Sequence, residues 1–255
     1  MFNILNELPM ILLGLPAILI SLSVHETAHG YAAYQLGDPT AKNLGRLTLN
    51  PLKHIDPIGF IAMIFFRIGW ANPVPVNSRF FKKPRRDMAI TAAAGPISNL
   101  CLAIIFTLLL RLVLIPLESI TDGTFELIGN TYYYDPTVAE NAAFMPLSIL
   151  ALMLFIGVSL NLNLMVFNLI PLPPLDGSRI AYIFLPTELY FKVMQYEKYI
   201  MIGFIVLLAS GIISLPLGIV TGAFTDALNF ITGMPEDVLG FVNAYIGSSL
   251  PTFSL

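Results

Sequence analysis

The sequence predicts an all-α polytopic membrane protein, and two observations carry this prediction. Hydrophobic residues make up 56% of the 255 residues and charged residues only 11%, with a mean hydropathy of +0.78. A soluble globular domain carries roughly twice that share of charged residues. In addition, four long segments hold at most one charged residue each, and about 20 apolar residues are enough for a helix to cross a bilayer. These segments are residues 8–37, 88–110, 141–175 and 199–225.

The first apolar segment is expected to be part of the folded protein. No basic residue precedes it, and its apolar run continues past any cleavage site that a signal peptide would need. Cys101, in the second segment, excludes an intrachain disulfide because it is the only cysteine, and we interpret it as a packing residue. The net charge of −3 gives no reason to expect a nucleic-acid partner.

Basic residues predict the orientation, because Lys and Arg are retained in cytoplasmic loops. All but Arg111 of the 13 Lys and Arg residues lie in the connections that follow the first and third apolar segments. Both termini are therefore expected outside. A fifth apolar stretch, residues 57–66, must then be re-entrant or interfacial, because a single crossing there would place the basic residues of 79–86 on the wrong side. Before it, residues 43–51 alternate leucines with polar residues and weakly suggest a small β-hairpin near the cytoplasmic face.

The motif HETAH lies inside the first apolar segment. Its two histidines, His25 and His29, are one helical turn apart on the same face, the spacing with which both bind one zinc ion, and Glu26 lies beside them. A polar helix face is the alternative interpretation. An ionised side chain at the centre of a membrane costs about 2.5 to 3.5 kcal/mol, so a chance occurrence there is a poor explanation.

A zinc site needs a third ligand, and the best candidate is Asp176. The continuation of HExxH found in metzincins requires Gly and His where this chain has Ala32 and Gln35. Asp176 ends the stretch NLIPLPPLDG, in which three prolines stop the third apolar helix, and we expect extended chain there. Such backbone is tolerated at membrane depth only beside protein or a water-filled cavity, which indicates a site. The alternative is that Asp176 is a helix N-cap.

Two further features carry less weight. In AAAGPISN, Gly95 and Pro96 either kink a packed helix or contribute directly to the site, and the sequence leaves both interpretations open. His54 lacks ligand spacing, so we interpret it as a structural residue at the interface.

These motifs occur in an order that identifies a resemblance. HETAH in the first span, GPISN in the second and NLIPLPPLDG at the end of the third resemble the site-2 protease family of intramembrane zinc metalloproteases, over residues 8–179. The resemblance implies one catalytic Zn²⁺ bound by His25, His29 and Asp176, with Glu26 as the catalytic base. It also implies a membrane-protein substrate, usually with a single span, cut inside or beside its helix in regulated intramembrane proteolysis.

The chain resembles a compact member of that family. The connection 118–140 is too short for a PDZ domain, and no nucleotide-binding module follows the fourth span. We expect a single membrane domain over 1–255, with a catalytic core at 8–179, a fourth span at 199–225 and an interfacial tail at 226–255. The expected location is the lipid bilayer of a prokaryotic cell, with the active site in the cytoplasmic half.

These residues also predict a mechanism, and two alternative functions compete with it. Glu26 would take a proton from the attacking water, and Asn168, expected on the extended stretch, is a candidate for binding the substrate or the oxyanion. One alternative is a metal transporter or metal-binding membrane protein, although a transporter needs no Glu beside the first ligand. A second alternative is an inactive membrane scaffold of the same fold.

Overall fold

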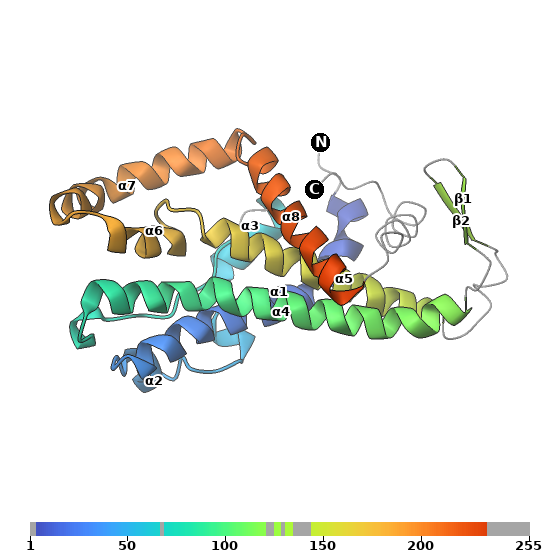
Figure 1. The fold of residues 1–255 in the computed structure, drawn as a ribbon, viewed down its shortest axis with the longest axis horizontal. Coiled ribbons are helices and arrows are strands. Elements are labelled where there is room, and N and C mark those ends of the chain that lie inside the picture. The colour runs from blue at the N-terminus through green and yellow to red at the C-terminus, as the bar shows by residue number, and fades with distance from the viewer. Residues whose placement is uncertain (1–3, 67–68, 121–124, 129–130, 135–143, 234–255) are drawn as a thin grey trace. The chain divides into compact units, whose positions relative to one another are not determined.

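The computed structural model describes residues 4–66, 69–120, 125–128, 131–134 and 144–233. Nearly all regular structure in these residues is helical (Figure 1). The α-helices are α1 (Ile4–Gln35), α2 (Thr40–Asn43), α3 (Pro57–Phe66), α4 (Pro84–Ile120), α5 (Phe144–Asn168), α6 (Asp176–Ala181), α7 (Thr187–Ala209) and α8 (Ser214–Thr232). Short 3-10 helices are η1 (Pro51–Lys53), η2 (Ser78–Phe80) and η4 (Tyr182–Phe184).

Four helices are long and apolar enough to cross a membrane, which confirms the predicted fold class. The candidate spans are Ile11–Gln35, Pro84–Leu117, Pro146–Asn168 and Ser214–Thr232. Large apolar side chains stay exposed along α4, as expected of a helix that faces lipid; they include Ile97, Ile104, Leu108, Leu112 and Ile115.

The fourth span differs from its predicted boundaries. Residues 199–225 do not form one helix, because α7 ends at Ala209 and α8 begins at Ser214. Gly211 lies between them with φ of 75°, a left-handed conformation that ends helices and suits glycine. The hydroxyl of Ser214 donates to the carbonyl of Gly211 and closes the turn. Residues 226–232 of the predicted tail therefore belong to α8, and residues 234–255 lie outside the described part of the chain.

The expected hairpin at 43–51 is not formed. Gly45 has a positive φ of 64°, and the side chain of Asn50 accepts from the Leu52 amide at 3.1 Å to begin η1. The Thr48 carbonyl accepts from the Thr27 hydroxyl at 2.7 Å, so a side chain occupies a group that a strand ladder would need. The described hairpin lies elsewhere, where strands β1 (Phe125–Ile128) and β2 (Thr131–Tyr134) pair antiparallel within the connection between α4 and α5.

Helix α3 has ten residues and reaches about 15 Å, half the thickness of the hydrocarbon core. It cannot cross the bilayer, in agreement with a re-entrant or interfacial segment. The Asp56 carboxylate accepts from the Gly59 amide at 2.7 Å and satisfies one of the free donors at the start of α3.

Contacts divide the chain into two compact units, with boundaries that fall inside long helices. One unit comprises residues 1–18, 103–159 and 225–255. Its core packs one face of α4, where leucines recur every three or four residues, against α5; the buried residues are Leu110, Leu114, Leu117, Ala151 and Leu152. The other unit comprises Leu19–Leu102 and Leu160–Phe224, and every candidate site residue lies in it.

Candidate metal centre

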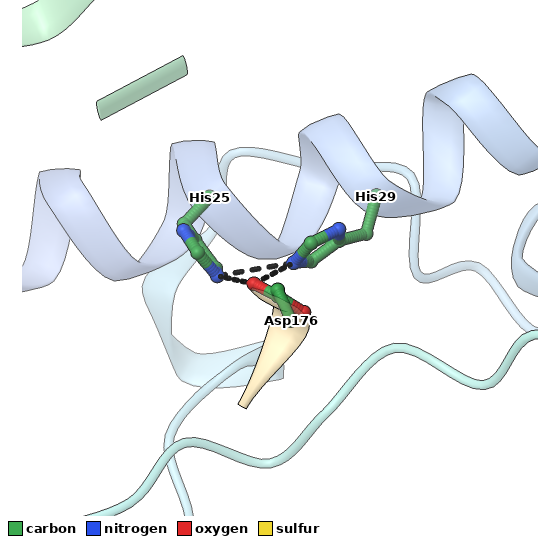
Figure 2. Close-up of side chains that lie close together, drawn as sticks. All are labelled: His25, His29 and Asp176. Carbon is green, nitrogen blue, oxygen red and sulfur yellow. Dashed lines mark hydrogen bonds and ion pairs between the residues drawn. The ribbon is translucent and has the colours of Figure 1, made fainter. Parts of the chain in front are cut away.

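His25 and His29 lie on one face of α1, as the HETAH spacing predicts. Both side chains are buried, and their Nε2 atoms are 3.0 Å apart. Figure 2 shows both rings turned toward the same point beside the helix. Two imidazole nitrogens at this separation leave no room for a water between them, which suits a shared cation.

Asp176, the first residue of α6, completes the cluster. Its Oδ2 atom lies 3.3 Å from His25 Nε2 and 3.2 Å from His29 Nε2 (Figure 2). The N-cap position of α6 is occupied by Leu175, and no side chain caps the helix. The alternative interpretation of Asp176 as an N-cap is therefore wrong, because its carboxylate faces the two histidines.

The three ligand atoms fit a zinc ion. A tetrahedral ion with bonds of about 2.0 to 2.1 Å separates its ligand atoms by about 3.3 to 3.4 Å, close to the observed 3.0, 3.2 and 3.3 Å. Asp176 Oδ2 is buried, and none of the described residues gives it a hydrogen bond of good geometry. Such an orphaned oxygen is costly unless a cation satisfies it. Two imidazoles and one carboxylate also form a ligand set of catalytic zinc sites.

Hydrogen bonds to the far side of each ring fix the tautomer. His25 Nδ1 donates to Asn99 Oδ1 at 2.5 Å, and His29 Nδ1 donates to the carbonyl of Thr91 at 2.8 Å. Both partners are acceptors, so the proton of each neutral ring resides on Nδ1. The lone pair of each Nε2 atom then points at the cluster, as metal binding requires.

The contact to His25 extends into a chain of buried amides. Asn99 Nδ2 donates to Asn161 Oδ1 at 2.8 Å, and Asn161 Nδ2 donates to the hydroxyl of Ser21 at 2.8 Å. All three residues have no exposed surface. In this arrangement each amide oxygen accepts and each amide nitrogen donates, so the hydrogen-bonded chain runs without a break from Ser21 to His25. Sequence reasoning missed Asn161, although an asparagine inside an apolar span is itself a signal.

The absence of a side chain at Gly95 leaves room for the imidazole rings of His25 and His29. A Cβ atom at this position would lie 2.6 Å from His25 Cε1 and still closer to His29 Nε2. Only glycine therefore allows α4 to approach α1 at the histidines. Of the two interpretations of this motif, the structure favours a direct contribution, because Gly95 and Asn99 lie one turn apart and both contact the histidine pair.

The loop before Asp176 is folded and not extended, which corrects the expectation for this segment. Asn168 is the last residue of α5, and its Nδ2 donates to the Leu164 carbonyl at 3.0 Å. In residues 169–175, every amide N–H has a partner; the donors are Leu169, Ile170, Leu172 and Leu175, and the other positions are prolines. A Cβ on Gly177 would collide with the backbone of Leu169 and Ile170, so this glycine allows α6 to begin against the loop.

Glu26 is buried beside the histidines, and its Oε2 accepts from the amide of Val74 at 2.8 Å. Sequence reasoning did not identify this partner, which lies 48 residues away. The carboxylate of Asp176 is held in its charged form. Burial by itself raises the pKa of Asp176, but the imidazoles of His25 and His29, when they are protonated, donate to the carboxylate, outweigh the effect of burial and lower that pKa to about 2.

His54 lies outside the cluster. It is fully buried, and its Nε2 lies 2.7 Å from the Thr48 carbonyl, while its own carbonyl accepts from the Asn72 amide at 2.7 Å. These contacts connect two loops, in keeping with the structural role predicted for it.

Comparisons with known proteins agree with this geometry. Residues 13–210 match peptidase family M50. The chain is 42% identical over 201 residues to "Putative zinc metalloprotease YwhC" of Bacillus subtilis, an alignment that covers 79% of this chain and 80% of that protein. It is 30% identical over 163 residues to "Putative zinc metalloprotease Rip2" of Mycolicibacterium smegmatis, covering 62% of this chain and 52% of that protein. A Mycobacterium tuberculosis protein of the same name is 27% identical over 165 residues, with the same coverage. No solved structure matches the chain.

Proposed function

Because the chain belongs to peptidase family M50, the site-2 protease family, we propose that it is a zinc-dependent endopeptidase acting on membrane proteins. It hydrolyses a peptide bond in or beside a transmembrane segment, in regulated intramembrane proteolysis of a single-span substrate. One observation carries this proposal. His25, His29 and Asp176 meet at one buried point beside a helix that is apolar enough to cross the bilayer, with Glu26 on that same helix.

The zinc ligands in this proposal are His25 Nε2, His29 Nε2 and Asp176 Oδ2. When bound, zinc supplies a Lewis acid that polarises the scissile carbonyl and makes water nucleophilic at neutral pH. The chain's own contribution is preorganisation, because Asn99 and the Thr91 carbonyl hold both rings in the tautomer that presents Nε2.

Glu26 acts as the base. Its carboxylate takes a proton from the attacking water as the water oxygen bonds to the carbonyl carbon, and then gives that proton to the amine nitrogen as the C–N bond breaks. The burial of Glu26 favours this role, because a carboxylate shielded from bulk water exchanges its proton with the bound reactants. The side chain of Asn168 remains our candidate for binding the substrate or the oxyanion, and to do so its amide must leave the Leu164 carbonyl.

The substrate helix must open before it can be cut. A peptide bond inside an intact helix has its carbonyl hydrogen-bonded and is shielded by side chains, so water cannot approach it in a productive geometry. Gly, Pro or Asn near the scissile bond should therefore speed cleavage, and Leu or Ala there should slow it.

The complete set of ligand atoms, with a carboxylate beside them, supports an enzyme over a metal transporter or an inactive scaffold of the same fold. The distribution of Lys and Arg supports both termini outside and the active site in the cytoplasmic half. The bacterial relatives support a prokaryotic cell membrane as the location.

The test uses the purified protein in proteoliposomes with a panel of single-span reporter proteins that differ only in helix-weakening residues. We expect cleavage that 1,10-phenanthroline abolishes and added zinc restores. Glu26→Gln should retain one zinc per chain and lose cleavage, whereas His25→Ala, His29→Ala and Asp176→Ala should each weaken zinc binding. Cleavage by Glu26→Gln at the normal rate, or a wild-type protein that binds no zinc, would show that the proposal is wrong.

A further inference from the structure

The segment of residues 72–77 follows α3 and lies against α1 at the candidate site. Its sequence, NPVPVN, places Val74 between two prolines, which hold the backbone extended and carry no N–H. Val74 is buried, and its amide donates to Glu26 Oε2 at 2.8 Å. The base of the proposed reaction thus accepts a hydrogen bond from the backbone of a distant segment.

Both ends of this segment are fixed by charged side chains. At its start, Arg46 Nη2 donates to the carbonyls of Asn72 at 2.7 Å and Pro73 at 3.3 Å. At its end, the amide of Asn77 donates to Asp38 Oδ2 at 2.6 Å. Asp38 is fully buried just after the end of α1. Hydrogen bonds to charged groups are about twice as strong as neutral ones, so the position of the segment along α1 is well defined.

Packing against α1 fixes the distance of this segment from the helix. Gly30 lies one turn after Glu26, and a Cβ there would be 3.0 Å from Val74 Cγ1 and 2.7 Å from Leu47 Cδ2. The absence of a side chain at Gly30 therefore allows Val74 to lie directly on the helix. A larger residue would lift the segment and move the Val74 amide away from the carboxylate.

We propose that Val74 is a positioning residue for the catalytic base. Its amide N–H holds Glu26 Oε2 in place and orients the carboxylate so that Oε1 receives the proton from water. The role of the base rests on the proposed function, but the contact itself does not. A fixed carboxylate loses no rotamer freedom on reaching the transition state, which is the benefit of preorganisation.

The first experiment measures the contact without any activity. Within residues 73–76 only Val74 and Val76 carry an amide N–H, so hydrogen exchange of overlapping peptides from 71–77 isolates Val74. The purified full-length protein is compared with Glu26→Ala, which removes the acceptor, and with His29→Ala, which removes a candidate metal ligand and leaves both partners of the Glu26–Val74 contact in place. We expect exchange at Val74 to accelerate at least about tenfold in Glu26→Ala and to stay unchanged in His29→Ala. Equal exchange in all three proteins would overturn the proposal.

The second experiment measures the consequence for catalysis with the reporter proteins described above. Val74→Pro removes the N–H, Val74→Ala keeps it but removes side-chain packing, and Val76→Pro is a matched proline control, because no described residue accepts from the Val76 amide. We expect Val74→Pro to lower kcat at least about tenfold, with KM and zinc content unchanged. The losses in Val74→Ala and Val76→Pro should be much smaller.

Replacement of Val74 by its α-hydroxy acid provides a second variant that deletes only the N–H, and it serves if Val74→Pro fails to fold. A normal kcat in a folded protein with this ester bond would overturn the proposal, as would equal losses in Val74→Pro and Val76→Pro. If the wild-type protein cleaves no reporter, the proposed function fails, while the exchange experiment still decides whether Val74 holds Glu26.

Discussion

Gly95 and His25 are in such close contact that a methyl group on Gly95 would lie 2.6 Å from Cε1 of the imidazole. Carbon atoms in contact are normally about 3.5 to 4.0 Å apart, so any side chain at this position displaces the histidine ring or the helix. The histidine pair is therefore shaped by α4 as much as by α1, the helix that carries it.

Gly95→Ala tests this relationship. We expect zinc affinity to fall at least about tenfold, because the added methyl pushes both Nε2 atoms out of their shared geometry. Competition with a chromogenic chelator measures the affinity of the purified protein. Gly222→Ala on α8 is the matched control, since nothing lies within 4 Å of a Cβ there. Equal affinities of the two variants would show that α4 does not shape the site.

Two substitutions of Asn99 distinguish the contribution of its hydrogen-bond acceptor from that of its side-chain volume. Asn99→Leu leaves the Nδ1–H of His25 without its partner, and we expect zinc affinity to fall about 10-fold to 100-fold. Asn99→Asp keeps an oxygen acceptor and should lose much less. If both variants bind zinc equally, the contribution of this contact to the histidine tautomer is negligible. Melting temperatures measured alongside distinguish lost affinity from lost folding.

The pH dependence of zinc binding should follow protonation of the histidine ligands and not protonation of Asp176. The pKa of Asp176 is lowered to about 2, so its carboxylate remains ionised as the pH falls from 7 to 4. Imidazoles must be neutral to bind metal, and an ordinary imidazole is half protonated near pH 6.5. Zinc occupancy, measured after dialysis at each pH, should therefore decline between about pH 7 and 5. Retention of zinc down to pH 3 would contradict this assignment.

Orientation is tested by cysteine labelling in intact cells. A Cys101→Ser background is needed first, because Cys101 is exposed and not the packing residue that the sequence predicted. Cysteines introduced at Ser78 and Thr187 should be protected from an impermeant reagent added outside, and one at Thr131 should react. External labelling at Ser78 would mean that α3 and its flanking residues cross the membrane.

The sequence predicted those features that depend on local spacing. His25 and His29 are one turn apart in any helix, and the prolines before Asp176 required the third span to end there. The features it could not predict depend on residues distant in the chain. Asn99 contacts a histidine 74 residues away, and Val74 contacts a glutamate 48 residues away. An asparagine inside an apolar span signals a polar contact but does not identify its partner, and a valine signals nothing, because it is common in helices and loops of every function.

Backbone conformation explains the remaining differences. Residues 199–225 contain no charged residue, so the search for long uncharged segments could not detect the break that the left-handed Gly211 introduces. At 43–51 the alternation of leucines imitates a strand, but the Thr48 carbonyl bonds to a side chain of α1. Tertiary contacts outweighed the local pattern there.

The loop at residues 169–175 has a chemical polarity that limits what it can offer a substrate. Its amide hydrogens are all engaged within the protein or absent at proline, so the backbone of this loop offers a substrate no free N–H donor. An unwound peptide beside this loop can donate its own N–H groups to it, but the carbonyls of the peptide must accept hydrogen bonds from another part of the protein. A substrate with proline facing the loop would have no N–H to donate at that position.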